Sequence, residues 1–262
     1  MSTNKRLTGK VALVTGAGDP RSIGRGIARA LADEGADVIV NDIRSDWLSS
    51  AVKDIQARGV RGAAFAADVS KPDQVAALFA DAVAALGRID IVASNAGIIR
   101  WEKFLDITPE NLRAMVDVNL KGNIIVCRAA AKQMIAQGGG GRIVITSSVQ
   151  ASIHFPITPV YGATKRAMFP LVGALAIELA PHNIIVNHIG PGWVQSALND
   201  PEPGQQTEEG IEATRQSVPL KRAGLIEEMG RAVVYYASAD GDYVTGTYLR
   251  LDGGLGISKY TL

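Results

Sequence analysis

The sequence is poor in features that mark several classes of protein. Cys127 is the only cysteine in 262 residues, so no disulfide can form within the chain. Because Cys127 lies in a helix-like apolar run, we interpret it as a small buried side chain, with a reactive thiol as the alternative. We identify no set of metal ligands.

Excess charge and long apolar runs are lacking as well. Lys and Arg total 27, Asp and Glu total 26, and the net charge is +1, which favours neither nucleic acid nor an anionic membrane as a partner. The first ten residues lead into the apolar run VALV, which is too short for a signal-peptide core or a membrane span. We therefore expect a cytoplasmic protein with neither of these partners.

Short apolar runs alternate with longer amphipathic ones along the chain, whose 47% hydrophobic and 20% charged residues are ordinary for a globular protein. Strands are expected at 11–15, 37–41, 62–67, 89–94, 142–147, 183–189 and 248–251. Helices are expected at 24–35, 45–58, 72–86, about 109–136 and from about 160. Continuous Val and Ile content suits strands buried on both faces, and the alternation implies right-handed crossovers. The pattern predicts an α/β fold: one doubly wound Rossmann-type domain over 1–262, with a seven-stranded, mainly parallel sheet and helices on both faces.

One segment, 199–217, breaks the alternation. It is polar and contains two prolines. Ligands of doubly wound sheets bind beyond the carboxyl ends of the strands, where the connecting loops gather. We therefore expect a loop here and regard it as a candidate substrate lid.

A glycine-rich turn follows the first expected strand and contains Gly16, Gly24 and Gly26. Glycines at such a turn let the backbone approach a pyrophosphate, and the following helix N-terminus supplies N–H donors. The alternative is a tight connection without a ligand, but the position after the first strand favours dinucleotide binding.

Acidic residues follow the second and third strands. Asp42 stands where a carboxylate can accept hydrogen bonds from the adenosine ribose hydroxyls and repel a 2′-phosphate, which favours NAD over NADP. Arg44 and Arg21 argue the other way, since either could meet a phosphate. Asp68 is placed to reach the adenine edge, or to act only as a neighbour of a helix cap.

Tyr161 and Lys165 are four residues apart and share one face of an expected helix. A nearby ammonium lowers the pKa of a phenol from about 10, so the pair can act as base in alcohol oxidation and as acid in carbonyl reduction. Such a pair is common on helix surfaces. Ser148 at the end of the fifth strand, Asn95 after the fourth strand and Asn119 in the long helix make a joint site the better interpretation.

These residues together resemble the classical short-chain dehydrogenase/reductase family from about residue 7 to residue 254. The resemblance is carried by Thr15, Gly16, Gly24, Gly26, Asp42, Asp68, Val69, NAG (95–97), Asn119, Ser148, Tyr161, Lys165, PG (191–192) and LDGG (251–254). It implies a catalytic tetrad of Asn119, Ser148, Tyr161 and Lys165. Lys165 would also hold the nicotinamide ribose, and Asn119 would position a water that links Lys165 to solvent. The implied NAD contacts are Gly16, Ser22, Ile23, Gly24, Asp42, Asp68, Val69, Asn95, Tyr161, Lys165, Pro191, Gly192, Val194 and Ser196, with Ile189 flanking the nicotinamide. Members are usually homotetramers.

Two departures from the family pattern stand out. Seven residues separate Gly16 from Gly24, where the family usually has three. The longer turn looks like that of the enoyl-acyl-carrier reductase branch and brings Ser22 near the expected pyrophosphate, but the spacing of Tyr161 and Lys165 remains the classical one. Ser94 replaces the Asn that commonly precedes NAG.

Loops after three strands are expected to line the substrate pocket with Arg100, Ser148, Gln150, His154, Tyr161 and Trp193. The segments around Tyr161 look similar to the sugar-oxidising, glucose 1-dehydrogenase-like branch, which implies oxidation of a sugar hydroxyl, the anomeric one giving a lactone. Arg100 and His154 add the hypothesis of an anionic sugar such as a uronate or sulfonated hexose. The alternatives are a carbonyl reductase of the 3-oxoacyl or keto-sugar type and a cofactor-binding regulator without catalysis.

Overall fold

The chain is described by a computed structural model over residues 5–198 and 208–257. In these ranges one sheet has seven strands in the order β3-β2-β1-β4-β5-β6-β7, and every neighbouring pair is parallel. The strands are β1 (Val11–Thr15), β2 (Asp37–Asp42), β3 (Gly62–Ala66), β4 (Ile91–Ser94), β5 (Gly141–Thr146), β6 (Ile184–Pro191) and β7 (Tyr248–Leu251). The predicted sheet and all its strands are confirmed, with ends that differ by at most two residues.

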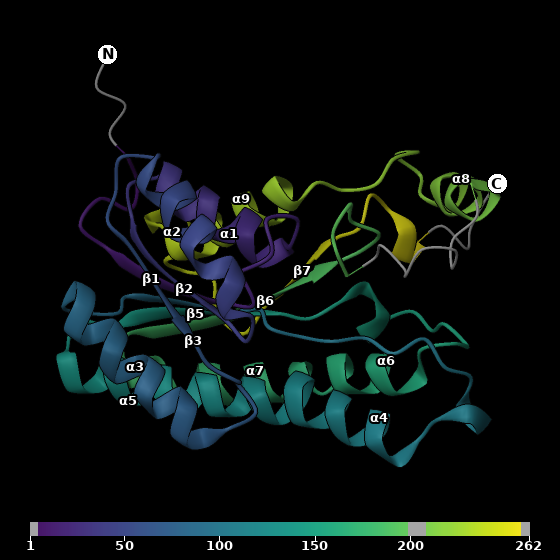
Figure 1. The fold of residues 1–262 in the computed structure, drawn as a ribbon, viewed down its shortest axis with the longest axis horizontal. Helices are drawn as coiled ribbons and strands as arrows, with labels where there is room; N and C mark the ends of the chain where they lie inside the picture. The colour runs from purple at the N-terminus through teal and green to yellow at the C-terminus, as the bar shows by residue number, and fades with distance from the viewer. Residues whose placement is uncertain (1–4, 199–207, 258–262) are drawn as a thin grey trace.

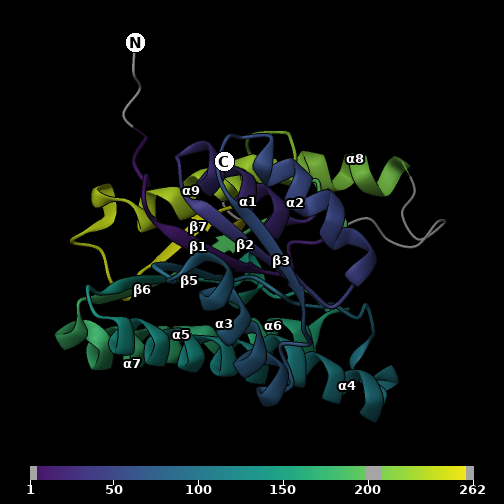
Figure 2. The ribbon, with the colours of Figure 1, turned by 60° about the vertical axis from the view of Figure 1, so that its left-hand side comes forward.

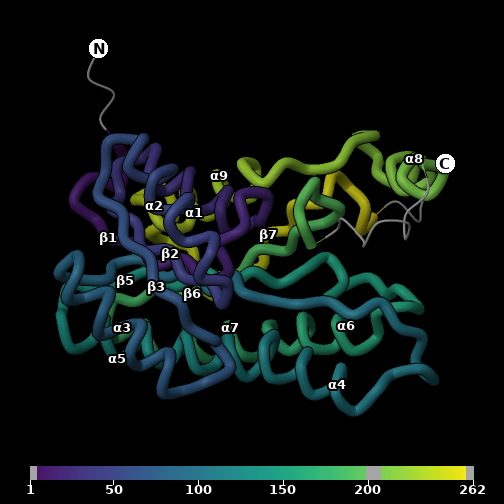
Figure 3. Tube along the Cα trace, in the orientation of Figure 1, coloured from purple at the N-terminus to yellow at the C-terminus, as the bar shows by residue number. Residues whose placement is uncertain are grey.

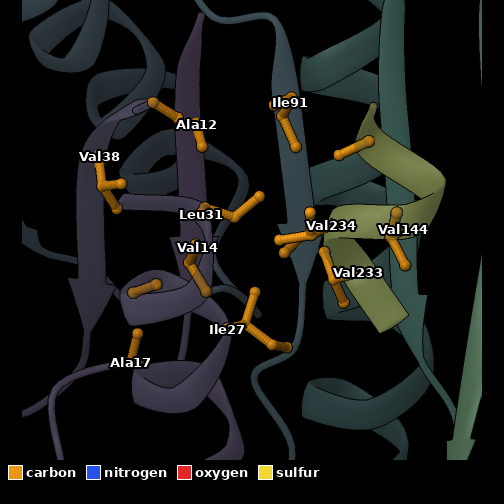
Figure 4. Close-up of a cluster of buried hydrophobic side chains, with 14 of the residues drawn as sticks. Ala12, Val14, Ala17, Ile27, Leu31, Val38, Ile91, Val144, Val233 and Val234 are labelled. Carbon is orange, nitrogen blue, oxygen red and sulfur yellow. The ribbon is translucent and has the colours of Figure 1, made fainter. Parts of the chain in front are cut away.

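Helices cover both faces of the sheet, as Figures 1 and 2 show. One face carries α1 (Ile23–Asp33), α2 (Leu48–Gln56) and α9 (Ile226–Ala237), and the other carries α3 (Pro72–Leu86), α5 (Asn123–Gln137) and α7 (Met168–Leu179). Each interface holds an apolar cluster, and Figure 4 shows Ile27, Leu31, Val233 and Val234 packed on the strands of the first one. Burial on both faces explains why β1 is apolar up to its last residue, Thr15.

The strand order reverses between β1 and β4, which are neighbours in space but not in sequence. Figure 3 traces the chain through these elements in the orientation of Figure 1. Register pairs Thr15 with Asn41 and Val14 with Ala93, so the carboxyl ends of β1, β2 and β4 meet at one edge. Loops that leave these ends diverge to opposite faces and open a crevice there.

The sequence analysis missed α9, which packs against α1. The two helices approach so closely that a Cβ added at Gly230 would lie 2.5 Å from the carbonyl oxygen of Gly26. The Glu228 carboxylate accepts a hydrogen bond from the amide N–H of Leu225 at 2.8 Å, which stabilises the helix N-terminus. Buried residues recur with helical spacing (226, 229, 230, 233, 234 and 237), a signal that could have revealed this helix.

The expected loop at 199–217 is in part a helix. Residues 208–217 form α8 (Glu208–Ser217), and 199–207 lie outside the described residues. Glu208 and Glu209 in the first turn and Arg215 in the last turn complement the helix dipole. The segment is polar, but the prediction of a loop over 208–217 was wrong because these residues form a helix.

The expected helix over about 109–136 is interrupted. It consists of α4 (Pro109–Met115), a π-helical turn over Val116–Gly122, and α5. Inside the turn, the side-chain amide of Asn123 donates to the carbonyl oxygen of Asn119 at 2.6 Å. The extra residue of the turn rotates Asn119 relative to a regular helix, and such turns recur at functional sites.

The helix expected from about 160 is divided into α6 (Pro159–Arg166) and α7. Pro170 falls in the first turn of α7, where a missing N–H costs little. Among the described residues, no helix combines the length and apolarity needed to cross a membrane.

Candidate active site

A cavity of about 950 Å3 opens at the carboxyl edge of the sheet. Its lining includes residues at or just beyond the ends of six strands: Gly16, Asp42, Asp68, Asn95, Ser148 and Pro191. This is the crevice that the reversal of strand order opens. The predicted cofactor turn, three of the four predicted catalytic residues (Ser148, Tyr161 and Lys165) and part of the predicted substrate pocket therefore share one cavity.

The glycine turn packs directly onto the loop after β4. Gly16 has a φ of +63°, and a Cβ at this position would lie 2.8 Å from the Cα of Ala96. The Asn95 side chain donates to the carbonyl oxygens of Thr15 and Gly16 at 3.1 and 3.2 Å. Gly16 lines the cavity, whereas Gly24 is buried beneath the turn, where a Cβ would lie 2.7 Å from Nδ2 of Asn95. Gly24 thus acts through packing.

The extra residues of this turn are held by Arg25, which the sequence analysis missed. Arg25 is 1% exposed; its Nε donates to the carbonyl oxygen of Ala17 at 2.9 Å and Nη2 donates to that of Gly18. Nη1 pairs with Asp54 at 3.2 Å. Burial lowers the pKa of Arg25, and the hydrogen bond to Asp54 opposes that shift. A lone arginine next to a glycine gives no sequence signal for this role.

Ser22 and Ile23 lie where α1 begins and line the cavity. The hydroxyl of Ser22 accepts a hydrogen bond from the Arg25 amide at 3.0 Å and donates to the carbonyl oxygen of Asp19 at 2.8 Å. Ser22 is therefore the N-cap of α1 and leaves the helix N-terminus facing the cavity.

Asp42 is the last residue of β2 and lines the cavity. One carboxylate oxygen accepts from the Gly18 amide at 2.8 Å and the other from the Arg44 amide at 3.1 Å. The Arg44 guanidinium pairs with Asp46 at 2.8 Å and lies over the Trp47 ring. The Asp42 carboxylate thus faces the cavity, while the Arg44 guanidinium interacts with Asp46 and Trp47.

The residues after β3 also reach the cavity. Asp68 and Val69 both line it. A carboxylate oxygen of Asp68 accepts from the Ser70 amide at 2.9 Å, so the side chain stabilises its own turn as well. The two interpretations of Asp68 are therefore compatible.

The four predicted catalytic residues come from three segments. Tyr161 and Lys165 lie on α6, Ser148 follows β5, and Asn119 lies in the π-helical turn. The Lys165 ammonium is 5.6 Å from the centre of the Tyr161 ring and donates to the carbonyl oxygen of Thr146 at 2.9 Å. A Cβ added at Gly97 would lie 3.2 Å from both Oδ1 of Asn119 and Nζ of Lys165, so these side chains converge.

Burial dominates the pKa values of Tyr161 and Lys165 in the protein without its cofactor. Burial raises the pKa of Tyr161 to about 12, and a hydrogen bond with the Ser148 side chain only partly opposes this. Burial also lowers the pKa of Lys165 to about 8. Desolvation therefore dominates in the protein without its cofactor, and the expectation that Lys165 and the oxidised nicotinamide together lower the phenol pKa stays a prediction.

Asn119 positions the loop after β4. Its side chain accepts from the Ile98 amide and donates to the Ile98 carbonyl oxygen, both at 2.8 Å. Its backbone carbonyl accepts from Asn123, whose Oδ1 accepts the hydroxyl of Ser94 at 2.7 Å. Ser94, the departure from the family pattern, is thus matched by Asn123, a partner that the sequence analysis missed.

The cavity lining contains one buried hydroxyl, that of Ser196, whose hydrogen-bonding capacity is unsatisfied in the described part of the chain. Ser196 is 3% exposed and lines the cavity, and its hydroxyl has no hydrogen-bond partner in the described part of the chain. Pro191 and Gly192 line the cavity beside it. A carboxamide such as that of nicotinamide would satisfy this hydroxyl. With the glycine turn, Asp42 and Ser196 in one lining, the cavity fits a nicotinamide dinucleotide.

Two residues that we expected to contact the cofactor, Val194 and Ile189, are buried in the protein. Val194 is fully buried and pairs with Gly224 in an isolated bridge. Ile189 lies in the core beneath α9. Neither side chain belongs to the cavity lining, and their expected contacts with the cofactor stay predictions.

The cationic corner predicted from Arg100 and His154 does not form. Arg100 lines the cavity, but its guanidinium is exposed and donates to Asn111 at 3.3 Å and to the carbonyl oxygen of Ile99 at 3.1 Å. His154 is exposed and lines a separate hollow of about 510 Å3 beside Arg166. The two side chains therefore line different hollows.

Much of the remaining wall is apolar, which the sequence analysis did not foresee. Trp193 lines the cavity as predicted, and Gln150 does so while its side chain accepts the Thr158 hydroxyl at 2.6 Å. The apolar wall consists of Ile99, Trp101, Phe155, Ile157, Trp193, Leu198 and Leu255. These residues come from four loops, so only the folded chain brings them together.

A buried histidine lies behind the site. His188 on β6 is 1% exposed, and its Nδ1 has no hydrogen-bond partner among the described residues. Its ring lies 4.8 Å from the rings of Phe169 and Tyr248. Burial lowers the pKa of His188 from 6.5 to about 4.

This histidine should make the fold sensitive to acid. Between the folded-state pKa near 4 and the ordinary value of 6.5, the unfolded chain binds the proton more readily, so acidification favours unfolding. From about pH 7 to pH 5 we expect wild type to lose about 2 kcal/mol more unfolding free energy than His188→Phe. Denaturant titrations at both pH values measure this. Equal losses in the two proteins would contradict the assignment.

The comparisons with known proteins agree with this geometry. Residues 16–256 match the family model described as "Enoyl-(Acyl carrier protein) reductase". Versicolorin reductase 1 of Aspergillus parasiticus is 38% identical over 264 residues, which cover 97% of this chain and 99% of the relative. L-rhamnose 1-dehydrogenase (NAD(P)(+)) of Sphingomonas sp. is 38% identical over 253 residues, with 96% and 98% covered.

A solved structure supports the same assignment. Gluconate 5-dehydrogenase of Burkholderia cenocepacia, in complex with NADP and tartrate, has a TM-score of 0.89 and 33% identity over 96% of this chain and 97% of its own. The fold, the crevice and the matched sequence extend over nearly the whole chain. The chain therefore belongs to the short-chain dehydrogenase/reductase family and is an oxidoreductase of that family.

Proposed function

We propose that the protein oxidises a sugar hydroxyl with NAD, with Tyr161 as the base and the anomeric hydroxyl, which gives a lactone, as the first candidate. The observation that carries this proposal is the convergence of Ser148, Tyr161 and Lys165 in the cavity that Asp42 also lines. Tyr161 and Ser148 share a hydrogen bond, so a substrate oxygen can lie against both hydroxyls.

Each side chain has a separate task in this reaction. Ser148 donates a hydrogen bond to the substrate oxygen, and Tyr161 takes the proton of the substrate hydroxyl. Lys165, held by the Thr146 carbonyl, supplies positive charge next to the phenol and can contact the ribose. Bound NAD supplies the hydride acceptor and a positive charge on its oxidised ring.

Asp42 supports the preference for NAD. A 2′-phosphate near its carboxylate would meet like charge, and the Arg44 guanidinium that could neutralise such a phosphate is paired with Asp46. We expect kcat/KM for NAD to exceed that for NADP by about 100-fold, and Asp42→Ser to reduce this ratio. Steady-state kinetics with both cofactors measure it. A wild-type ratio near one, or a ratio that Asp42→Ser leaves unchanged, would contradict the role of Asp42.

A neutral sugar fits the cavity better than an anionic one, because Arg100 and His154 do not meet in its wall. The names of the rhamnose and gluconate dehydrogenases support sugar oxidation in general. NAD reduction should be screened against aldoses, deoxy sugars, polyols and uronates. Higher kcat/KM for uronates than for neutral aldoses would restore the anionic alternative.

The apolar wall favours a second candidate, reduction of a carbonyl on a larger ring system. Trp101, Phe155 and Trp193 offer aromatic surface for a flat apolar substrate. The name of the versicolorin reductase, 38% identical, fits this candidate as well. Turnover of polycyclic ketones with NADH, together with no turnover of any sugar, would favour this function over the first.

Assembly into a homo-oligomer, a homotetramer by the family resemblance, is also part of the proposal. The surface helices α5 and α7 expose apolar side chains to solvent, which is unfavourable in a monomer. Ile124 and Ile135 on α5 are 42% and 43% exposed, and Ile177 on α7 is 80% exposed. A second copy of the chain would bury them.

A further inference from the structure

We propose that Tyr248 is a positioning residue for Ser148, a role that rests on the function proposed for Ser148. The hydroxyl of Tyr248 donates to the backbone carbonyl oxygen of Ser148 at 2.9 Å. Tyr248 is the first residue of β7, and 100 residues separate it from Ser148. The last strand of the sheet is thereby tied to the turn that carries the serine.

The neighbouring strand leaves room for this contact. Register pairs His188 of β6 with Tyr248, and Gly190 follows on the same face of β6. A Cβ added at Gly190 would overlap the hydroxyl and the ring of Tyr248. Glycine at this position therefore lets the phenol cross β6 and reach the end of β5.

The ring of Tyr248 packs against two other rings. Phe169 and His188 each lie 4.8 Å from it, centre to centre, and 4.8 Å from each other. Arg166 lies 4.4 Å over the Phe169 ring and donates to the carbonyl oxygen of Ala151 at 3.2 Å. The Ser148 turn is thus anchored at two carbonyl groups, by Tyr248 at its start and by Arg166 at its end.

The anchoring bears on the chemistry through the serine side chain. The Ser148 hydroxyl accepts from the Gln150 amide at 3.1 Å and forms the hydrogen bond that opposes the rise in the Tyr161 pKa. A shift of the Ser148 backbone would weaken that hydrogen bond. The phenol would then hold its proton more tightly, and oxidation at neutral pH would slow.

The test is Tyr248→Phe, which removes one oxygen and keeps the ring, with Tyr236→Phe as the matched control. Tyr236 is a buried tyrosine whose hydroxyl bonds with Thr247, the residue next to Tyr248, at 2.9 Å. We expect Tyr248→Phe to lower kcat by about 10-fold, to leave KM for NAD unchanged and to move the pH profile of oxidation to higher pH. The control should change none of these.

A spectroscopic titration makes the test independent of the substrate. Phenolate absorbance with NAD bound is measured for each protein and for the same protein with Tyr161→Phe, and the difference reports Tyr161. We expect Tyr248→Phe to raise the midpoint by about one pH unit. An unchanged midpoint, or an equal rise in Tyr236→Phe, would overturn the proposal. Failure to oxidise any sugar would refute the proposed function and leave this titration informative.

Discussion

Replacing Tyr161 with phenylalanine is expected to lower kcat by about 1,000-fold, because the substitution removes the one hydroxyl in our mechanism that takes the substrate proton. Affinity for NAD should change little, since Lys165 and the glycine turn remain. The structure adds a pH dependence. Burial raises the pKa of Tyr161 to about 12, so the phenolate is scarce at neutral pH and increases with pH. Oxidation by wild type should therefore speed up toward alkaline pH.

The rate of the reverse reaction should have the opposite pH dependence. Carbonyl reduction needs the protonated phenol, so its rate should fall at high pH. Steady-state kinetics in both directions, with cofactor binding measured by fluorescence, check these expectations. Tyr243→Phe is a suitable control, because Tyr243 is fully exposed. Turnover by Tyr161→Phe close to that of wild type would refute the assignment of the base.

Replacing Arg25 with methionine is the second large effect that we expect. The substitution leaves the carbonyl oxygens of Ala17 and Gly18 without their donor and takes one partner from Asp54. Breaking such a buried set typically costs about 3–5 kcal/mol. We expect a clear loss of unfolding free energy and a rise of at least about 10-fold in KM for NAD, because Gly18 also donates to Asp42.

Arg29→Met provides the matched control for this prediction. Arg29 donates to the same carboxylate of Asp54 at 2.7 Å but contacts no carbonyl of the turn. Denaturant unfolding and KM for NAD should be measured for both variants. If Arg29→Met raised KM as much as Arg25→Met, the effect would come from Asp54, and the role of Arg25 in holding the turn would be wrong.

The sheet could be predicted from the sequence because its central strands are buried on both faces and so contain continuous apolar runs. β1 and β5 show this most clearly. The helix α9 was missed although Ile226, Met229 and Val233 have helical spacing. The π-helical turn was not predicted, because the hydrogen bond between Asn119 and Asn123 that accompanies it has no distinct sequence pattern.

The site could be predicted where a residue type is required at a strand end, as for Asp42 and Ser148, or at a helical spacing, as for Tyr161 and Lys165. It could not be predicted where a side chain acts from a distance. Arg25 and Tyr248 donate hydrogen bonds to backbone carbonyl oxygens. Every residue has such a carbonyl, so the sequence does not indicate which residue accepts the hydrogen bond. The cationic corner failed for a related reason, since the direction of His154 depends on how its loop turns.

The central claim is that a hydride passes directly between the substrate and a nicotinamide in this cavity, with Tyr161 handling the proton. The most direct test uses a substrate that carries deuterium on the carbon bearing the reacting hydroxyl. We predict that deuterium appears on the nicotinamide ring of NADH in an amount equal to the product, that turnover slows relative to the unlabelled substrate, and that Tyr161→Phe slows the transfer by about 1,000-fold. Product formed with the deuterium lost to water would contradict the account.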